Sequence, residues 1–485
     1  MNFKFKHFII LNLIMFVTVQ YCFAKNIKIK DETGINFDTV RISENKAHIS
    51  NPVSLIYRKT TDKVIFEETI HKQQKTEGYW ISKISDPDKI ILNKKEIDKL
   101  NNDIYNLHLG ISNLKEYPKT IKKERLEKTF KQIFSYISKR NYLNESGEHL
   151  FPDFFITLQN KLDIPEQDEI NVRFAVTTKY NDVRLLPTSQ KIISNINSKD
   201  LDRLQEESID LGTPVIVLNQ TKDKDWCFVV TPTEEGWIKT ENLAFTDKKT
   251  FNKWLEMKKP VIVTEAKADI FIDKDKTKFL EYARMGTKLP YIGKKGKRTI
   301  CVNIPMSDKD GNLILQKGYL NSRDSHAGYL PYTQRNALSL AFNHLNSPYG
   351  WGGSNGEQDC SGYLGQIFNC FGILLPETSV QKIKCGQVIK LNKKDDDTIK
   401  NLSIIEQGVP GISFIYLLGH IMLYIGNDNG KPYVIQSIWG VTSFTEKNEK
   451  TVSYINRTIV SDLEIGSDVA GNSLIDRVSK FNIIK

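Results

Sequence analysis

The hydrophobic periodicity of this chain changes twice along its 485 residues, and these changes limit the folds that it can adopt. Up to about residue 165 apolar residues recur every three or four positions, which predicts amphipathic helices. From about 166 to 332 they alternate in short runs separated by Gly, Asp, Asn and Pro, which is typical of small β-barrels. From 333 onward helical and strand patterns mix. The sequence therefore predicts a multidomain α+β protein.

The N-terminal part carries two helical patterns. One face of the first is formed by Leu92, Ile97, Leu100 and Ile104, and "ERLEKTFKQIFSYI" gives the second. Neither contains a set of residues that could perform catalysis. We therefore expect residues 25–165 to be a helical packing segment.

The first 24 residues have the pattern of a secretory signal peptide. Lys4 and Lys6 precede the apolar run "FIILNLIMFVTV", and Ala24 provides a small residue for cleavage. The apolar run is shorter than the roughly 20 residues that a membrane span needs. We expect a secreted or periplasmic protein with no stable membrane insertion after signal cleavage.

The net charge and the cysteines of the chain indicate which partners and cofactors the protein can have. The formal net charge of +10 is spread along a lysine-rich chain, which favours an anionic wall polymer at least as much as nucleic acid; we expect no nucleic-acid partner. The five cysteines after the signal peptide include no CxxC pair, so we predict no metal and no cofactor. An odd number leaves at least one free thiol. Cys227 and Cys301 alternate within strand-like runs, which predicts buried positions.

The stretch "YGWGGSNGEQDCSGYLGQIF", residues 349–368, places Cys360 between a glycine-rich turn and a helix. The apolar residues that follow at helical spacing are Leu364, Ile367, Phe368 and Phe371. A helix that begins at Cys360 would lower the pKa of its thiol, and the first N–H groups could hold an oxyanion. Asp359 can cap this helix, and Ser361 leaves the approach to the sulfur open.

A cysteine nucleophile needs a base, and two histidines lie in the last 153 residues. His344 sits in a helical pattern beside apolar residues, so we expect a structural role. His420 opens the strand-like run "HIMLYIG". A hairpin that turns around Asp428 places Gln436 directly opposite His420, where it could orient the imidazole. The three residues fit the logic of a cysteine hydrolase.

Four segments resemble the NlpC/P60 cysteine peptidases, which are papain-like: "PYGWGG", "DCSGYLGQIF", "LPETSVQ" and "GHIMLYIG". Upstream, "TTKYNDVRLLPT", "DRLQEESIDLGTPVIVL" and "GYLNSRDSHAGYLPYT" resemble the paired bacterial SH3 modules of this family. The segment "DPDKIILNKKEIDKLN" is similar to the helical segment that docks on those modules. After the predicted signal peptide (1–24), we therefore expect a helical segment (25–165), two SH3-like barrels (166–250 and 251–332) and a papain-like peptidase domain (333–485).

The resemblance implies that Cys360 is the nucleophile, His420 the general base and Gln436 the orienting residue, a position at which the family more often has histidine. The reaction would be hydrolysis of the γ-D-glutamyl–diamino acid bond of peptidoglycan stem peptides, typically with meso-diaminopimelate. We expect a monomer. The substrate-binding residues implied are Tyr349, Trp351, Asp359, Ser361, Glu377, Thr378 and Ser379.

One loop departs from the family pattern. Relatives usually read like "LPRDS", where an acid and a serine hold the amino end of the substrate, but here Glu377 replaces the arginine and Thr378 replaces the acid. In relatives an SH3 module also blocks one end of the cleft, which favours stem peptides with a free N-terminal L-alanine. Two alternatives remain: a catalytically degenerate peptidoglycan-binding protein that uses its SH3-like modules, and an acyltransferase on a related fold.

Overall fold

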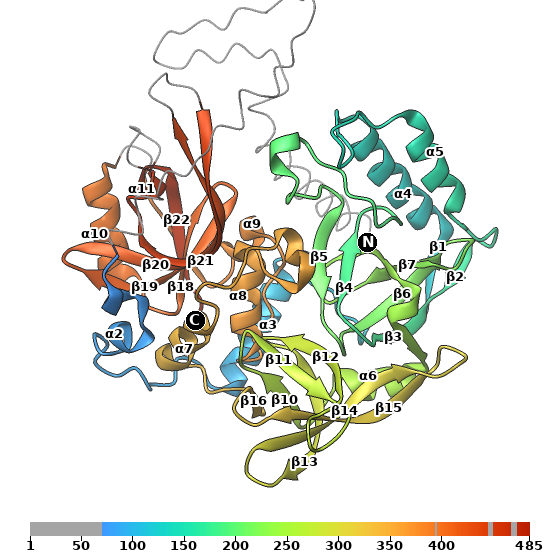
Figure 1. Ribbon diagram of the computed structural model, residues 1–485, viewed down its shortest axis with the longest axis horizontal. Coiled ribbons are helices and arrows are strands. Elements are labelled where there is room, and N and C mark those ends of the chain that lie inside the picture. The colour runs from blue at the N-terminus through green and yellow to red at the C-terminus, as the bar shows by residue number, and fades with distance from the viewer. Residues whose placement is uncertain (1–69, 393–394, 445–449, 467–472) are drawn as a thin grey trace, which may run out of the picture. The chain divides into compact units, whose positions relative to one another are not determined.

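The structure, a computed structural model, describes residues 70–392, 395–444, 450–466 and 473–485. The predicted signal peptide lies outside these residues. No helix in the described part of the chain is long and apolar enough to cross a membrane. The fold is α+β as predicted, with helices at the N-terminal end, a β-rich middle and a C-terminal α+β region (Figure 1).

The N-terminal segment is helical because its apolar stripes match the α-helical period. In the first predicted helix, Asn93 forms a capping box with Glu96, and Ile97, Leu100 and Ile104 are buried. Leu92 lies outside the helix, in a β-bridge with Tyr332. The elements are η3 (Lys72–Lys75), α2 (Glu77–Ile81), α3 (Lys94–Asn106), β1 (Thr120–Lys122), α4 (Lys123–Ser138), α5 (Pro152–Lys161) and β2 (Glu169–Asn171).

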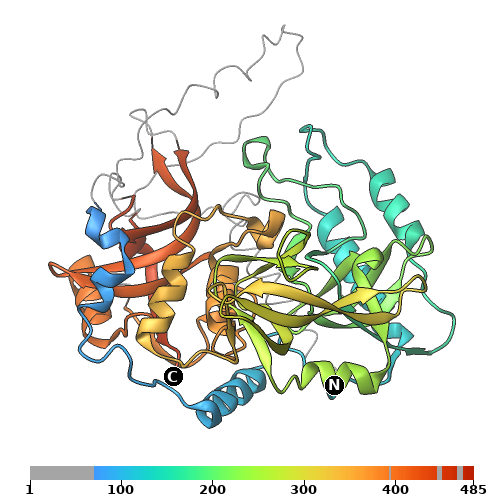
Figure 2. The ribbon, with the colours of Figure 1, turned by 60° about the horizontal axis from the view of Figure 1, so that its bottom comes forward.

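Two parts of this segment pack on different regions. Phe130 of α4 stacks on Trp237 at 5.3 Å between ring centroids, within the core of the following sheet. Helix α3, drawn in blue in Figure 2, contacts the C-terminal region instead: the side-chain amide of Asn101 donates to the carbonyl oxygen of Gly372 and accepts from the backbone N–H of Leu374. The N-terminal segment therefore joins the β-rich middle to the C-terminal region.

The first β-unit (residues 173–246) is a seven-stranded antiparallel sheet in the order β5-β4-β8-β7-β6-β3-β9. Its strands carry alternating and β-branched residues, and Cys227 lies buried in its core as predicted. Its elements are β3 (Arg173–Thr177), β4 (Asn181–Arg184), η4 (Ile196–Ser198), β5 (Gln205–Ile209), β6 (Pro214–Gln220), β7 (Trp226–Val230), β8 (Glu235–Lys239), η5 (Thr240–Asn242) and β9 (Leu243–Thr246).

The second β-unit (residues 260–327) is a second seven-stranded sheet, ordered β12-β11-β15-β14-β13-β10-β16. Helix α6 (Lys248–Leu255) connects the two units. Cys301 is buried in β14, again as predicted. The strands are β10 (Pro260–Val263), β11 (Lys267–Phe271), β12 (Phe279–Arg284), β13 (Lys288–Lys295), β14 (Thr299–Ser307), β15 (Leu313–Asn321) and β16 (Ser325–Ala327).

The C-terminal unit (residues 333–485) packs helix α8 (Cys360–Asn369) against a six-stranded sheet in the order β17-β22-β18-β19-β20-β21 (Figure 1). The apolar run 412–426 forms buried strands as predicted. The other helices are α7 (Gln334–Asn343), η6 (Trp351–Gly356), α9 (Ser379–Lys382), α10 (Asp397–Gln407) and α11 (Leu474–Arg477). The strands are β17 (Gln387–Lys390), β18 (Ser413–Leu417), β19 (His420–Asp428), β20 (Lys431–Phe444), β21 (Lys450–Asp462) and β22 (Val478–Ile483).

Candidate active site

Helix α8 begins at Cys360, as the spacing of the apolar residues predicts. The carboxylate of Asp359 caps the helix by accepting hydrogen bonds from the backbone N–H groups of Ser361 and Gly362 at 2.9 and 2.7 Å. The hydroxyl of Ser361 also donates to Asp359. Cys360 as a residue is only 8% exposed, so it lies in a nearly closed site. The cap thus fixes the position of the cysteine at the first turn of the helix.

The glycine-rich loop before α8 is held on the outside by both β-units. Gly353 has a φ of 79°, and a Cβ there would lie 1.7 Å from the hydroxyl oxygen of Ser208 in the first β-unit. A Cβ at Gly356, with a φ of 70°, would lie 2.0 Å from the hydroxyl oxygen of Tyr282 in the second. Glycine is therefore needed at both positions for two reasons: the backbone adopts a positive φ, and the β-units approach too closely for a side chain.

His420 and Gln436 meet, and a third residue fixes the amide. Nε2 of His420 lies 2.6 Å from Oε1 of Gln436, whose own Nε2 donates to Oγ of Ser461 at 2.8 Å. Because the amide nitrogen is engaged by Ser461, its oxygen faces the ring and accepts from an Nε2–H. That tautomer leaves the lone pair of Nδ1 of His420 free to accept a proton.

The predicted pairing of these two residues is wrong, although their contact is present. The chain turns at Asn429 and Gly430, both with positive φ, and a bulge follows Tyr424. The register beyond the bulge, with Leu423 opposite Ile435, places Gln436 two residues away from the position opposite His420. A shift of two residues keeps a side chain on the same face of the sheet, so the diagonal pair still meets.

Cys360 lies against the start of β19. The backbone N–H of Ile421, the residue after His420, interacts with the thiol and favours its ionised form. This contact brings the cysteine on α8 to the strand that carries the histidine. Cys360, His420 and Gln436 thus come together where α8 meets β19 and β20.

The prediction of a lowered thiol pKa is wrong. Burial, together with the neighbouring Asp359 carboxylate, raises the pKa of Cys360 to about 12. Burial also lowers the pKa of His420 to about 4, although its hydrogen bond to Gln436 acts in the opposite direction. The N-terminus of α8 does not outweigh the loss of solvation. At neutral pH both groups are therefore neutral: the imidazole of His420 is unprotonated and Cys360 is a thiol.

Trp351 and Tyr349 hold different positions in the loop. The guanidinium of Arg203, from the first β-unit, lies 5.2 Å from the ring centre of Trp351. The indole N–H of Trp351 is buried and has no hydrogen-bond partner among the described residues. Tyr349 is anchored through its backbone N–H, which donates to Asn456, and its ring lies close to Asp359 and Cys360.

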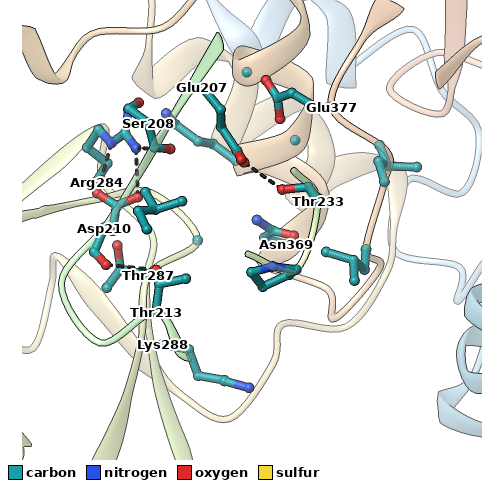
Figure 3. Close-up of a pocket in the computed structure, with 18 of the residues that line it drawn as sticks. Glu207, Ser208, Asp210, Thr213, Thr233, Arg284, Thr287, Lys288, Asn369 and Glu377 are labelled. Carbon is teal, nitrogen blue, oxygen red and sulfur yellow. Dashed lines mark hydrogen bonds and ion pairs between the residues drawn. The ribbon is translucent and has the colours of Figure 1, made fainter. Parts of the chain in front are cut away.

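An acidic cluster, formed by Glu206, Glu207 and Glu377, spans the first β-unit and the loop after α8. Glu207 accepts hydrogen bonds from the hydroxyls of Thr231 and Thr233 and interacts with Glu377, which Figure 3 shows nearby. Burial and the proximity of Glu377 raise the pKa of Glu206 to about 8 and also raise that of Glu207. Three carboxyl groups share a desolvated region near Asp359, which favours a cation there.

The loop after α8 is fixed by a buried lysine and by a helix cap. Nζ of Lys382 donates to the carbonyl oxygens of Pro376 and Glu377. Thr378 caps α9, and its hydroxyl donates to Oε1 of Gln381. The hydroxyl is therefore already used within the loop and does not replace the acid that the family pattern has at this position. Ser379 is 1% exposed, and its hydroxyl has no hydrogen-bond partner in the described part of the chain.

Sequence reasoning missed Arg203, Glu206, Glu207 and Lys382. The adjacent acids in "LQEESI" were a signal, because neighbouring residues of a strand face opposite sides and one glutamate must then be buried. His344, expected to be structural, is fully buried with an edge-on contact to Tyr363. Among the described residues no group of three or more His, Cys, Asp or Glu side chains is placed to hold a metal ion.

Comparison with known proteins gives two family matches. Residues 194–239 match the model of an SH3 domain of the SH3b1 type, and residues 346–431 match the NlpC/P60 family model. No curated protein matches the chain.

The solved structures similar to this chain include two bacterial proteins of the NlpC/P60 type. An NlpC/P60 endopeptidase from Photobacterium damselae subsp. piscicida is 21% identical, covers 84% of this chain and 96% of its own, and has a TM-score of 0.69. An NlpC/P60 family protein from Bacillus cereus is 17% identical, covers 64% and 98%, and has a TM-score of 0.45. The similarity to the Photobacterium structure shows that the two proteins share a fold over most of the described chain.

Proposed function

We propose, from the premise that this chain contains an SH3b domain and an NlpC/P60 domain, that it is a cysteine endopeptidase of peptidoglycan. One observation carries the proposal: His420 is held by Gln436 at 2.6 Å in the tautomer that accepts a proton on Nδ1, beside Cys360 at the start of α8. A base so oriented next to a thiol is what nucleophilic acyl transfer requires.

The reaction begins when Nδ1 of His420 takes the proton of the Cys360 thiol. The thiolate attacks the γ-carbonyl carbon of a D-glutamyl residue and forms a C–S bond. The backbone N–H of Cys360 is the donor that we assign to the oxyanion, because those of Ser361 and Gly362 already donate to Asp359. The C–N bond then breaks, and the imidazolium gives its proton to the leaving amine.

The second half of the reaction hydrolyses the thioester. With the amine gone, neutral His420 takes a proton from water, and the hydroxide attacks the acyl carbon. The C–S bond breaks, and the proton returns to the sulfur, which regenerates the thiol. Gln436 keeps one hydrogen bond to Nε2 throughout, so we assign it a positioning role.

The finer substrate assignment is a stem peptide with a free N-terminal L-alanine, cleaved between γ-D-glutamate and meso-diaminopimelate. The acidic cluster supports it, because an ammonium group near Glu206 and Glu377 would relieve the repulsion among buried carboxyl groups. Oε1 of Glu206 is buried without a hydrogen-bond partner among the described residues. Ser379 and Trp351 offer a hydroxyl and an N–H to the same peptide.

Export and the domain boundaries complete the proposal. A signal peptide over residues 1–24 would deliver the chain to the wall as a monomer, secreted or periplasmic. The helical segment (25–165) and the two SH3-like barrels (166–250 and 251–332) would close one end of the cleft of the peptidase domain (333–485). The contacts of Arg203 with Trp351 and of Arg284 with the carbonyl of Glu357 support this closure.

Mass spectrometry of peptide cleavage tests the proposal. The mature chain is incubated with L-Ala-γ-D-Glu-meso-diaminopimelate and with its N-acetyl form, next to Cys360→Ala as the matched control. We expect L-Ala-D-Glu from the free-amine peptide alone and none from the variant. Equal cleavage of both peptides would overturn the amino-end assignment. No cleavage of either would favour the peptidoglycan-binding alternative.

A further inference from the structure

Two lysines lie directly opposite each other on neighbouring strands of the C-terminal sheet. Lys480 of β22 pairs with Lys390 of β17 on one side and with Tyr416 of β18 on the other, and Tyr416 pairs with Ile421 of β19. Figure 1 shows β22, β18 and β19 side by side. Directly paired residues share one face of a sheet, so these four side chains form a row on the same face. We call Lys390 and Lys480 the lysine pair.

This row reaches the reacting residues at Ile421 and Tyr416. The backbone N–H of Ile421 interacts with the thiol of Cys360. Burial raises the pKa of Tyr416, and the neighbouring Cys360 acts in the same direction. Tyr416 also lies next to Lys480, whose Nζ is 5.5 Å from the centre of the tyrosine ring. Tyr416 is therefore a neighbour of both the nucleophile and the lysine pair.

The lysine pair has no counter-ion among the described residues. Lys390 is exposed and Lys480 is partly exposed, and neither forms an ion pair in this part of the chain. Lys431 of the same sheet, by contrast, pairs with Glu464 at 2.6 Å. Like charges that lie directly opposite each other destabilise a sheet. An anion held by the two lysines would remove this repulsion, and their exposure leaves the position open to a ligand.

Two further cations lie at the same end of the sheet. Burial and the charge of Lys480 lower the pKa of Lys384, which places these two ammonium groups near each other. The charge of Arg477, together with the larger effect of burial, lowers the pKa of His420. The adjacent carboxylate of Asp476 is engaged in the capping box of α11. This end of the sheet is therefore a cationic region that favours a carboxylate.

The distance from the nucleophile to the lysine pair fits a diamino acid. Neighbouring strands lie about 4.8 Å apart, so two spacings place Lys480 roughly 10 Å from Ile421 across the sheet. In meso-diaminopimelate six bonds join the nitrogen of the cleaved amide to the far carboxylate carbon, which is about 7–8 Å in extended form. The lysine side chain covers the remainder, because its ammonium lies at the end of a flexible four-carbon stem.

The charges around the nucleophile agree with the direction of the stem peptide. The proposed function assigns the amino end to the acidic cluster, and the diamino acid with its carboxylates follows the cleaved bond. Strand β21 contacts the first β-unit, because the hydroxyl of Tyr454 donates to the carbonyl oxygen of Asn197 at 2.7 Å. Strands β22 and β17 form the opposite edge of the sheet. The acidic and the cationic regions therefore belong to different elements of the molecule.

We propose that the lysine pair binds the far carboxylate of the diamino acid that follows the cleaved bond. This assignment rests on the proposed function and refines its substrate, because L-lysine at the same position of a stem peptide has no such carboxylate. Lys480, which is nearer to Cys360 in the row, makes the main contact, and Lys390 adds to it. The pair thus selects diaminopimelate stem peptides over lysine stem peptides.

Isothermal titration calorimetry of the mature chain with Cys360→Ala, which binds peptide without cleaving it, tests the site. The two probes are L-Ala-γ-D-Glu-meso-diaminopimelate and L-Ala-γ-D-Glu-L-Lys, which differ in the far carboxylate. We expect the first peptide to bind at least about fivefold more tightly, as for one partly exposed charge pair, and Lys480→Met to reduce this preference to below about twofold. Lys480→Arg should retain the preference.

The matched control is Lys485→Met, because Lys485 is exposed and lies beyond the other end of β22; it should keep the preference. An unchanged preference in Lys480→Met, equal affinities of the parent chain for the two peptides, or no binding at all overturns the site. Cleavage by the chain that retains Cys360 measures the proposed function separately. A preference lost in Lys480→Met supports the site even if no peptide is cleaved, whereas cleavage with an unchanged preference contradicts the site and leaves the proposed function standing.

Discussion

The two halves of the cleft are built in different ways. The reacting half, with Cys360, His420 and Gln436, lies within the C-terminal unit, where α8 packs on β19 and β20. The half that we assign to recognition joins Arg203 and Glu206 of the first β-unit to the loop that carries Glu377. In the proposed function, the chemistry therefore depends on one unit, whereas the choice of substrate depends on how two units meet. Substitutions in the reacting half should therefore lower kcat, whereas substitutions in the recognition half should change the preference between substrates.

The largest effect should follow loss of the base in the reacting half. In His420→Ala no group takes the thiol proton, so we expect kcat to fall at least about 10³-fold. His344→Phe is the matched control, because His344 is buried in the same unit and makes no hydrogen bond through its ring nitrogens among the described residues. Its kcat should stay within about threefold of wild type. Comparable losses in both variants would contradict the assignment of His420.

The orienting residue should have a smaller effect. Gln436→Ala removes the acceptor from Nε2 of His420, so the ring can rotate and kcat should fall by roughly 10- to 100-fold. KM should change little, because Gln436 is fully buried and lies behind the ring. Gln436→His should recover most of the activity. Failure of the histidine variant together with an unchanged Gln436→Ala variant would remove Gln436 from the mechanism.

The pH profile sharpens the account of the reacting half. Because burial lowers the pKa of His420 to about 4, the imidazole stays neutral and can accept a proton down to that pH. The acidic limb of kcat/KM should therefore lie well below the ordinary histidine value of about 6.5. Stopped peptide assays between pH 3.5 and 8 measure it. An acidic limb at or above pH 6.5 would contradict a neutral resting histidine.

The smallest effect concerns stability away from the cleft. Burial lowers the pKa of His344 to about 3, so below about pH 6.5 the unfolded chain takes up a proton that the folded chain refuses. His344 should therefore cost about 2 kcal/mol of stability between pH 6.5 and 5. Scanning calorimetry at pH 7 and 5 should show a smaller drop in Tm for His344→Phe. Equal drops would mean that His344 does not remain neutral on acidification.

Local signals were enough to predict the helix that begins at Cys360 and the strand that begins at His420. The apolar spacing after Cys360 fixes the start of α8, Asp359 is a strong cap, and the run after His420 has a strand pattern. The register was not predictable in the same way. A bulge after Tyr424 and a turn at Asn429 move the pairing by two residues without leaving a clear mark in the hydrophobic pattern.

The contacts in the recognition half were not predictable from the sequence, because they join residues that are far apart in the chain. Arg203 and Trp351 are 148 positions apart in the chain, and only the packing of two units brings them together. The raised pKa of Cys360 has the same origin, because burial comes from the assembled site and not from the helix that holds the thiol. The second β-unit was predicted from its alternation, although the SH3 family model matches only residues 194–239.

The most direct test of the two-part cleft is the ratio of kcat/KM for the free-amine and N-acetyl peptides, measured in wild type and in Glu206→Gln. The account predicts that the variant loses at least about tenfold of this ratio, as expected for one charged contact, while kcat for the free-amine peptide stays within about twofold. Glu241→Gln, an exposed glutamate of the same β-unit, should leave the ratio unchanged. An unchanged ratio in Glu206→Gln would contradict the role of the first β-unit in recognition.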